Sequence, residues 1–258
     1  MSIITLTTDF GLADGYVGIM KGVILGILPD VQLVDLSHDI APYDVRQAAY
    51  VLAQAAPHFP EATVHLAVVD PGVGTVRRPL LVRTSWATYV GPDNGLFSAA
   101  LAETGAQTWE LDRPEFWLPQ VSRTFHGRDV FAPVAAHAAR GVPPGKMGRQ
   151  ICDAVRLPLA RPAQRADGSI AGHVNHVDRF GNLVTDVPGA WVIGGRWECR
   201  VAGRRIPCIS MTYADVAHQA LVAIISSSGT VEIAVRDGNA AASLGVSTGE
   251  TVVFAPQM

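Results

Sequence analysis

The chain has 258 residues, of which 48% are hydrophobic and 17% are charged, so it can bury one large core or two smaller ones. A net charge of −3 and the absence of a lysine- or arginine-rich run argue against a nucleic-acid-binding protein. The sequence has no long apolar stretch, no signal-peptide pattern and only three cysteines, which lack metal-ligand spacing. We therefore expect no membrane segment, no secretion, and reduced thiols in the cytoplasm.

Residues 3 to about 152 alternate between runs typical of buried strands and amphipathic runs typical of helices. The expected strands are 3–7, 31–36, 64–69 and 89–90, and the expected helices are 15–28, 43–56, 96–104 and 129–140. Such alternation is typical of crossover units that place helices on the two faces of a sheet. It predicts an N-terminal α/β domain with a mostly parallel sheet.

The second part of the chain has a different pattern. Residues 157–168 carry two prolines and no periodicity, which predicts a linker; we place it at 158–167, between domains of residues 1–157 and 168–258. Short strand-like runs separated by glycine turns then follow, at 170–177, 183–187, 197–201, 205–209, 220–226, 231–235 and 252–254. They predict a smaller all-β, barrel-like domain at the C-terminus.

Polar residues follow the expected strand at 64–69, in a position where α/β proteins bind ligands. Asp70 ends this apolar run just before the Pro71-Gly72 turn, and Arg77 lies a few residues further on. A second glycine-containing segment carries His126. One carboxylate, one guanidinium and one imidazole could together orient and deprotonate a water molecule.

Asp9 and Asp14 follow the first expected strand. Either could cap the next helix, or could hold the vicinal hydroxyls of a ribose. Neither GxGxxG nor a P-loop motif occurs, so nothing predicts a dinucleotide or phosphate site. The histidines and aspartates lack metal-ligand spacing such as HExxH, and we expect no metal and no cofactor. A metal-dependent hydrolase stays open as an alternative.

Five motifs occur in an order that resembles one family. They are TTDFG (7–11), VDPGVGTVRR (69–78), YVGPDNGL (89–96), TFHGRDVFAP (124–133) and VDRFGN (177–182). The same motifs are found in the S-adenosyl-L-methionine hydrolases, also called SAM hydroxide adenosyltransferases, which are relatives of fluorinase and chlorinase. The resemblance runs from residue 3 to about 254 and implies an α/β domain followed by a β-barrel domain.

This resemblance also implies an activity and an assembly. The reaction would be hydrolysis of S-adenosyl-L-methionine to adenosine and L-methionine, through attack of water or hydroxide on ribose C5′ without a cofactor. The assembly would be a homotrimer, or a dimer of trimers, with sites between subunits. A module that binds adenosine or S-adenosyl-L-methionine without turnover stays open as a second alternative.

Site residues carry over from the family motifs. Asp70, Arg77 and His126 would hold the attacking water, and the spacing within the motif favours Arg77 over the adjacent Arg78. The residues that would bind the substrate are Asp9 for the ribose diol, Tyr43 near the ribose, Asp178 and Ser227 with help from Asp14 for the methionine group, Asn182 for adenine, Phe180 and Tyr213 as aromatic faces, and Asn239 and Ala240 in a loop that reaches adenine.

Two comparisons within the family refine this expectation. The halogenases carry a tyrosine where this chain has Asp70, and a Tyr-Ser pair where it has His126-Gly127, so the chain resembles the hydroxide branch. Ser226, Ser228 and Asp186 depart from the family pattern, which bears on the methionine end of the site and on the local hairpin.

Overall fold

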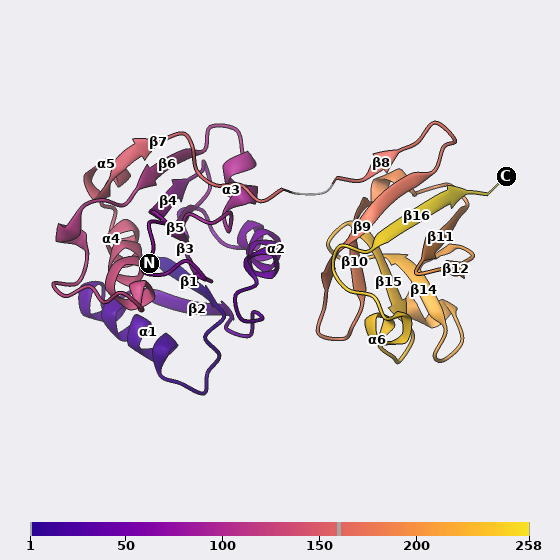
Figure 1. Cartoon of the computed structure of the whole chain (residues 1–258), viewed down its shortest axis with the longest axis horizontal. Coiled ribbons are helices and arrows are strands. Elements are labelled where there is room, and N and C mark those ends of the chain that lie inside the picture. Colours follow the sequence, from indigo (N-terminus) through magenta and orange to yellow (C-terminus); the bar gives the residue numbers. More distant parts are fainter. Residues whose placement is uncertain (1, 159–160, 258) are drawn as a thin grey trace. The chain divides into compact units, whose positions relative to one another are not determined.

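A computed structural model describes residues 2–158 and 161–257, and the contacts divide the chain into two compact units, Met1–Leu157 and Pro158–Met258. Each unit has its own sheet (Figure 1). Residues 159–160 of the predicted linker lie outside the described residues. A short strand within the predicted linker, β8 (Ala163–Gln164), pairs with β9 (Ile170–Val177) of the second unit. None of the helices in the described ranges has the length and hydropathy needed to span a lipid bilayer.

The sheet of the first unit has seven strands in the order β2-β1-β3-β5-β4-β6-β7. Its members are β1 (Ile3–Thr8), β2 (Gln32–Ser37), β3 (Val64–Val68), β4 (Pro79–Arg83), β5 (Thr88–Pro92), β6 (Gln107–Glu110) and β7 (Arg149–Ile151). The pairs from β2 to β5 are parallel, whereas the pairs β5–β4, β4–β6 and β6–β7 are antiparallel.

The sheet is therefore mixed, and the expectation of a mostly parallel sheet is wrong. The error lies in β4, β6 and β7, which were not predicted. These strands have five, four and three residues, too few to display a clear alternation of apolar and polar side chains. Strand β4 is joined to β5 by a short hairpin, which an antiparallel pair allows, so no helix separates these two strands in the sequence.

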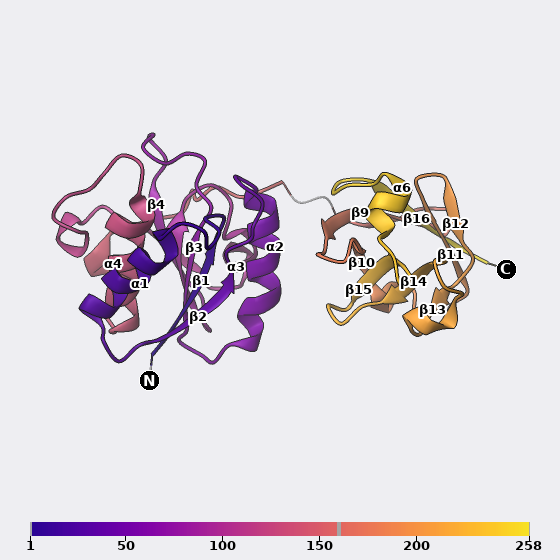
Figure 2. The ribbon, with the colours of Figure 1, turned by 90° about the horizontal axis from the view of Figure 1, so that it is seen from below.

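Helices cover both faces of this sheet (Figure 2). On one face, α1 (Tyr16–Ile27) and α4 (Ala132–Ala139) share a core with Leu66 and Val68. On the other face, α2 (Val45–Ala55) and α3 (Ser98–Ala102) share a core with Ala67 and Val69. The helix predicted at 129–140 begins as a π-helical turn, Gly127–Phe131, and a short helix α5 (Pro144–Met147) precedes β7. Because both faces are covered, every residue of β3 is buried, including its one polar residue, His65, and Asp70 follows shortly after the strand ends.

The second unit is a nearly closed, barrel-like sheet. The strands after β9 are β10 (Leu183–Pro188), β11 (Trp197–Val201), β12 (Arg204–Ile206), β13 (Ile209–Ser210), β14 (Leu221–Ile225), β15 (Thr230–Val235) and β16 (Thr251–Pro256). Their order is β12-β11-β16-β9-β10-β15-β14-β13, and only β13–β14 is a parallel pair. The strand predicted at 205–209 is two strands, because Pro207 cannot donate to a ladder. A short helix, α6 (Ala240–Leu244), follows β15.

Candidate active site

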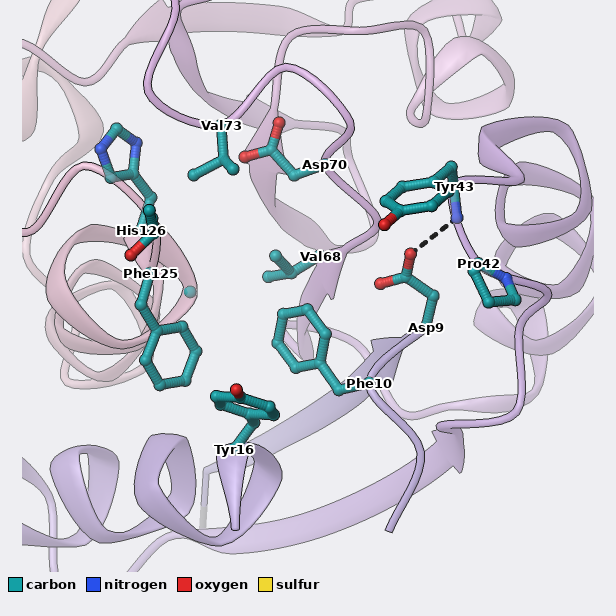
Figure 3. Close-up of a pocket in the computed structure, with 12 residues that line it drawn as sticks. Asp9, Phe10, Tyr16, Pro42, Tyr43, Val68, Asp70, Val73, Phe125 and His126 are labelled. Carbon is teal, nitrogen blue, oxygen red and sulfur yellow. Dashed lines mark hydrogen bonds between the residues drawn. The ribbon is translucent and has the colours of Figure 1, made fainter. Parts of the chain in front are cut away.

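A cavity of about 380 Å³ lies where β1 and β3 end in the first unit (Figure 3). It brings together four of the predicted site residues, Asp9, Tyr43, Asp70 and His126. The whole lining is Asp9, Phe10, Tyr16, Pro42, Tyr43, Val68, Asp70, Val73, Thr124, Phe125, His126 and Gly127. Polar side chains therefore meet at the carboxyl ends of parallel strands, as the sequence predicts.

Asp70, Arg77 and His126 form one hydrogen-bonded cluster. The Nε atom of Arg77 donates to Oδ1 of Asp70 at 2.9 Å and to Oδ2 at 3.0 Å, and Nη2 also contacts Oδ2. The same Nη2 lies 2.8 Å from Nδ1 of His126. The side chains of Asp70 and Arg77 are only 6% and 9% exposed. Such a dry, fork-shaped ion pair fixes the position of both charges.

The contact with Arg77 defines the hydrogen placement on His126. A guanidinium group has five donors and no acceptor, so Nδ1 of His126 must accept and the ring proton lies on Nε2. Burial lowers the pKa of His126 below its ordinary value, and the Arg77 charge lowers it further. His126 is therefore a neutral imidazole at neutral pH, with its ring proton on Nε2.

Arg78 has a different environment from Arg77. Its Nη2 lies 2.7 Å from Oδ2 of Asp93, and its Nη1 lies 2.8 Å from Oδ1 of Asp153. Arg78 is thus bonded to Asp93 and Asp153, whereas Arg77 is bonded to Asp70. The choice between the two arginines, which rested on motif spacing, thus has a geometric reason.

The loops that carry Asp70 and His126 lie against each other. A Cβ atom on Gly74 would lie 2.4 Å from the carbonyl oxygen of Arg123, and Gly74 has a φ of +76°. Only glycine satisfies both the close approach and the left-handed backbone at this position. Gly74 therefore brings the first loop, with Asp70 and Arg77, within reach of His126.

Asp9 is bonded to the backbone of another loop. Its Oδ2 accepts from the Tyr43 N–H at 2.9 Å (Figure 3). Tyr43 has a φ of +68°, which is rare for an aromatic residue and concentrates at functional sites. Neither Asp9 nor Asp14 caps α1, whose N-cap is Gly15 without a side-chain bond, so the capping alternative is wrong for both. Asp14 is exposed and does not line the cavity.

An aromatic wall completes the cavity and was not predicted. The rings of Phe10, Tyr16 and Phe125 pack edge to face, with centroids 5.2 to 5.9 Å apart. Phe10 and Phe125 are adjacent in sequence to Asp9 and His126. This adjacency within the motifs is the sequence feature that could have predicted them as part of the site. The wall gives one side of the cavity an apolar surface.

The other predicted binding residues lie in the second unit. A separate open cavity of about 800 Å³ is lined by Phe180, Asn182, Tyr213, Ala214, Val235, Arg236, Asp237, Gly238 and Asn239. Asp178 shapes its rim: Oδ1 accepts from the N–H groups of Phe180 and Asn182 at 2.8 and 2.9 Å, and Oδ2 accepts from Nδ2 of Asn182 at 3.0 Å. Asp178 therefore organises the turn that presents Phe180 and Asn182.

Asn239 and Ala240 begin α6. Oδ1 of Asn239 accepts from the Ala242 N–H at 2.7 Å as a helix cap, and Ala240 is buried. Ser227 lies exposed on the hairpin between β14 and β15. Of these three residues only Asn239 lines the open cavity, and Ala240 has no exposed surface in this structure.

Glu232 is a buried carboxyl that sequence reasoning missed. Its Oε1 accepts from the Tyr213 hydroxyl at 2.6 Å. Burial raises the pKa of Glu232, and the charge of Asp178 adds to this rise. In a strand that alternates apolar and polar residues, a single acidic residue is expected to face solvent. The tertiary fold instead covers Glu232 with the segment around Tyr213.

The three departures from the family pattern have structural partners. Asp186 accepts from the His173 N–H at 2.7 Å, across the β9–β10 pair. The hydroxyls of Ser226 and Ser228 lie 2.7 Å apart within their hairpin.

Within residues 2–158 and 161–257, no three His, Cys, Asp or Glu side chains converge as a metal site.

Comparison with known proteins identifies the family. The chain matches the SAM hydroxide adenosyltransferase N-terminal domain over residues 4–148 and the corresponding C-terminal domain over residues 172–253. It is 44% identical over 256 residues to the (R)-S-adenosyl-L-methionine hydrolase of Thermus thermophilus. The aligned region covers 95% of this chain and 96% of that protein. The chain belongs to the SAM hydroxide adenosyltransferase family.

Two further similarities agree with this assignment. A fluorinase from Nocardia brasiliensis is 31% identical over 212 residues, which cover 72% of this chain and 71% of that protein. The crystal structure of an uncharacterized conserved protein from Thermotoga maritima is similar to this one with a TM-score of 0.91. That structure has 34% sequence identity, and the match covers 98% of this chain and 99% of that chain.

Proposed function

We propose that this protein is an enzyme that hydrolyses S-adenosyl-L-methionine to adenosine and L-methionine. The observation that carries the proposal is the Asp70–Arg77–His126 cluster, which faces a cavity in a member of this family. The relative from Thermus thermophilus, whose name specifies the (R) sulfonium, supports the same substrate here. A water oxygen forms a bond to ribose C5′ while the C5′–S bond breaks, and the sulfur leaves with both bonding electrons.

The chemistry makes modest demands on the protein. The substrate is already a sulfonium and the leaving group is a neutral thioether, so no acid has to protonate it. What remains is to hold one water molecule in line with the C–S bond and to remove its proton. The aromatic wall of Phe10, Tyr16 and Phe125 would keep other water away from C5′.

Hydrogen placement divides the roles within the cluster. His126, whose Nδ1 accepts from Arg77, offers Nε2–H and so donates to the attacking oxygen. The proton then passes to Asp70, because a carboxylate that accepts from Nε and Nη2 of Arg77 still has lone pairs free. Arg77 holds both groups and stabilises the hydroxide character that develops on the water.

Substrate-binding roles follow from the family resemblance. Asp9 binds the ribose diol through the oxygen that Tyr43 does not use, and the Tyr43 ring packs near the ribose. Asn182, Phe180, Tyr213 and the loop at Asn239 and Ala240 receive adenine, while Asp178, Ser227 and Asp14 receive the methionine group. The open cavity bounded by Phe180, Asn182, Tyr213 and Asn239 supports the adenine assignment.

We also propose a homotrimer, or a dimer of trimers, in which each site combines the first unit of one copy with the second unit of the next. The division of the proposed residues between two compact units supports this arrangement. The cytoplasm is the proposed compartment, since Cys152, Cys199 and Cys208 are all free thiols.

A product assay tests the activity. Purified protein treated with a chelator is incubated with the (R) or the (S) sulfonium of S-adenosyl-L-methionine, and adenosine and methionine are separated by chromatography. We expect both products in equal amounts from the (R) compound without added metal. Tight binding without products would indicate a binding module, and activity that appears only with a divalent metal would indicate a metal-dependent hydrolase.

A further inference from the structure

The turn Gly91–Gly95 contacts the backbone beside Asp70. Nδ2 of Asn94 donates to the carbonyl oxygen of Val69 at 2.9 Å, and Oδ1 of Asn94 accepts from the Leu96 N–H at 3.2 Å. The parallel pairing of β3 with β5 runs only to Leu66 and Val90, so the ladder does not reach Val69. Val69 is fully buried, and a buried carbonyl without a partner is costly. Asn94 thus supplies the bond that holds the chain where Asp70 begins.

The neighbouring residue of the same turn holds the chain beside Arg77. The Asp93 N–H donates to the carbonyl oxygen of Arg78 at 3.0 Å, and Oδ2 of Asp93 accepts from Nε of Arg78 at 2.9 Å. The Asp93 side chain is only 2% exposed, and its Oδ1 accepts from the Val155 N–H at 2.8 Å. Asp93 therefore binds both the backbone carbonyl and the guanidinium of Arg78, the residue that directly follows Arg77.

We propose that Asp93 and Asn94 are positioning residues for the Asp70–Arg77 pair. Asn94 fixes the backbone at Asp70, and Asp93 acts through Arg78 on the backbone at Arg77. The two ends of the loop that carries the pair, seven residues apart in sequence, are thus tied to two adjacent residues of one turn. This inference rests on the proposed function, because it assigns a role in the reaction that Asp70 and Arg77 carry.

The turn itself is well supported, which makes a positioning role possible. A Cβ atom on Gly91 would lie 2.1 Å from the Ala67 carbonyl oxygen, so β5 lies tightly against β3 next to the site. On the other side, Oγ of Ser98 donates to the Gly95 carbonyl at 2.6 Å and accepts from the Leu157 N–H at 2.8 Å. A rigid turn transmits the position of its Asp93 and Asn94 side chains to the loop that they bind.

The test is a set of variants in the complete chain, assayed for adenosine release from S-adenosyl-L-methionine. Asn94→Asp keeps the acceptor for Leu96 but loses the donor to Val69. Asp93→Asn keeps the shape but weakens the hold on Arg78. We expect each to lower kcat by about 10- to 100-fold with KM unchanged, because small misplacement of a reacting group has effects of that size.

A pH profile separates positioning from general loosening. In Asp93→Asn the acid limb of kcat should move to higher pH, because Arg77 would no longer hold down the pKa of His126 as strongly. Ser98→Ala is the matched control: it removes two hydrogen bonds from the same turn without touching Val69 or Arg78. It should lower the melting temperature and reduce kcat far less than either turn variant, because the bonds to Val69 and Arg78 remain, and it should leave the pH profile unchanged.

The outcomes are distinct. The proposal would be overturned if both turn variants lost no more kcat than Ser98→Ala does. It would also be overturned if their loss of kcat came with an equal rise in KM. If Asp93→Asn fails to fold, Arg78→Lys, a milder change to the same ion pair, carries the same expectation for kcat. If Asn94→Asp fails to fold, Asn94→Ser, whose shorter side chain cannot reach Val69, replaces it. An unmodified protein that releases no adenosine would instead refute the proposed function.

Discussion

The two units of this protein use their polar residues in different ways. In the first unit the side chains of Asp70, Arg77 and His126 are bonded to one another. In the second unit Asp178 and Asn239 are bonded to the backbone of their own loops. Charges that are fixed against each other before any ligand arrives are suited to stabilising a reacting centre. Side chains that shape loops are suited to presenting a surface to a ligand, so the comparison supports the proposal that the chemistry belongs to the first unit and adenine recognition to the second.

The largest effect should come from breaking the cluster of the first unit. Asp70→Asn and His126→Ala should lower turnover by about 100- to 10,000-fold, the range expected for loss of proton transfer and of a positioned donor. Affinity for the substrate, measured by calorimetry, should be retained, because in the proposed mechanism these groups hold the attacking water and not the substrate. Glu110→Gln, which alters a partly exposed ion pair with Arg149 in the same unit, should change neither quantity. Equal losses of binding and turnover would make Asp70 and His126 substrate-binding residues instead.

Mixing two inactive chains tests the division of labour between the units. Asp9→Ala impairs the first unit and Asp178→Ala impairs the second. In randomly mixed trimers with sites between subunits, about a quarter of the sites should combine two intact units. Adenosine release should therefore return after the variants are refolded together, with mass spectrometry to verify subunit exchange. No recovery despite exchange would put both residues in the site of a single chain.

The stability of the first unit should depend on pH through His65, which lies away from the cavity. Burial lowers the pKa of His65 to about 4, from an ordinary value of 6.5. The unfolded chain thus takes up a proton as the pH falls from 6.5 to 4 while the folded chain does not, and folding free energy is lost in that window, by up to about 3 kcal/mol.

Denaturant unfolding followed across this pH range measures the effect. His65→Gln should flatten the pH dependence of the first unit, and His218→Gln, at an exposed histidine of the second unit, should leave it unchanged. The same slope in the unmodified protein and in His65→Gln would show that other groups are responsible.

The smallest expected effect is that of chloride. In the proposed mechanism the Asp70 carboxylate lies beside the attacking water, where a negative charge would repel a halide ion but accept a hydrogen bond from water. A high chloride concentration should therefore give no 5′-chloro-5′-deoxyadenosine at neutral pH. Chromatographic detection of this nucleoside from the unmodified protein would contradict the account of its selectivity.

Much of this architecture could be predicted because the signals are local. The apolar run of β3 ends abruptly at Asp70, and the glycine turns of the second unit mark its short strands. The failures have physical reasons. Strands β6 and β7 are too short to show a period, and the burial of Glu232 beneath Tyr213 joins residues 19 apart in sequence. The link from Asn94 to Val69 spans 25 residues and has no pattern of its own.

The source of the new oxygen tests the central claim most directly. Purified protein is incubated with S-adenosyl-L-methionine in water enriched in oxygen-18, and the products are analysed by mass spectrometry. Attack of an activated water on C5′ predicts one labelled atom in adenosine, at O5′, and no label in methionine. Adenosine without the label, or label in methionine, would contradict a water held by Asp70, Arg77 and His126 as the nucleophile.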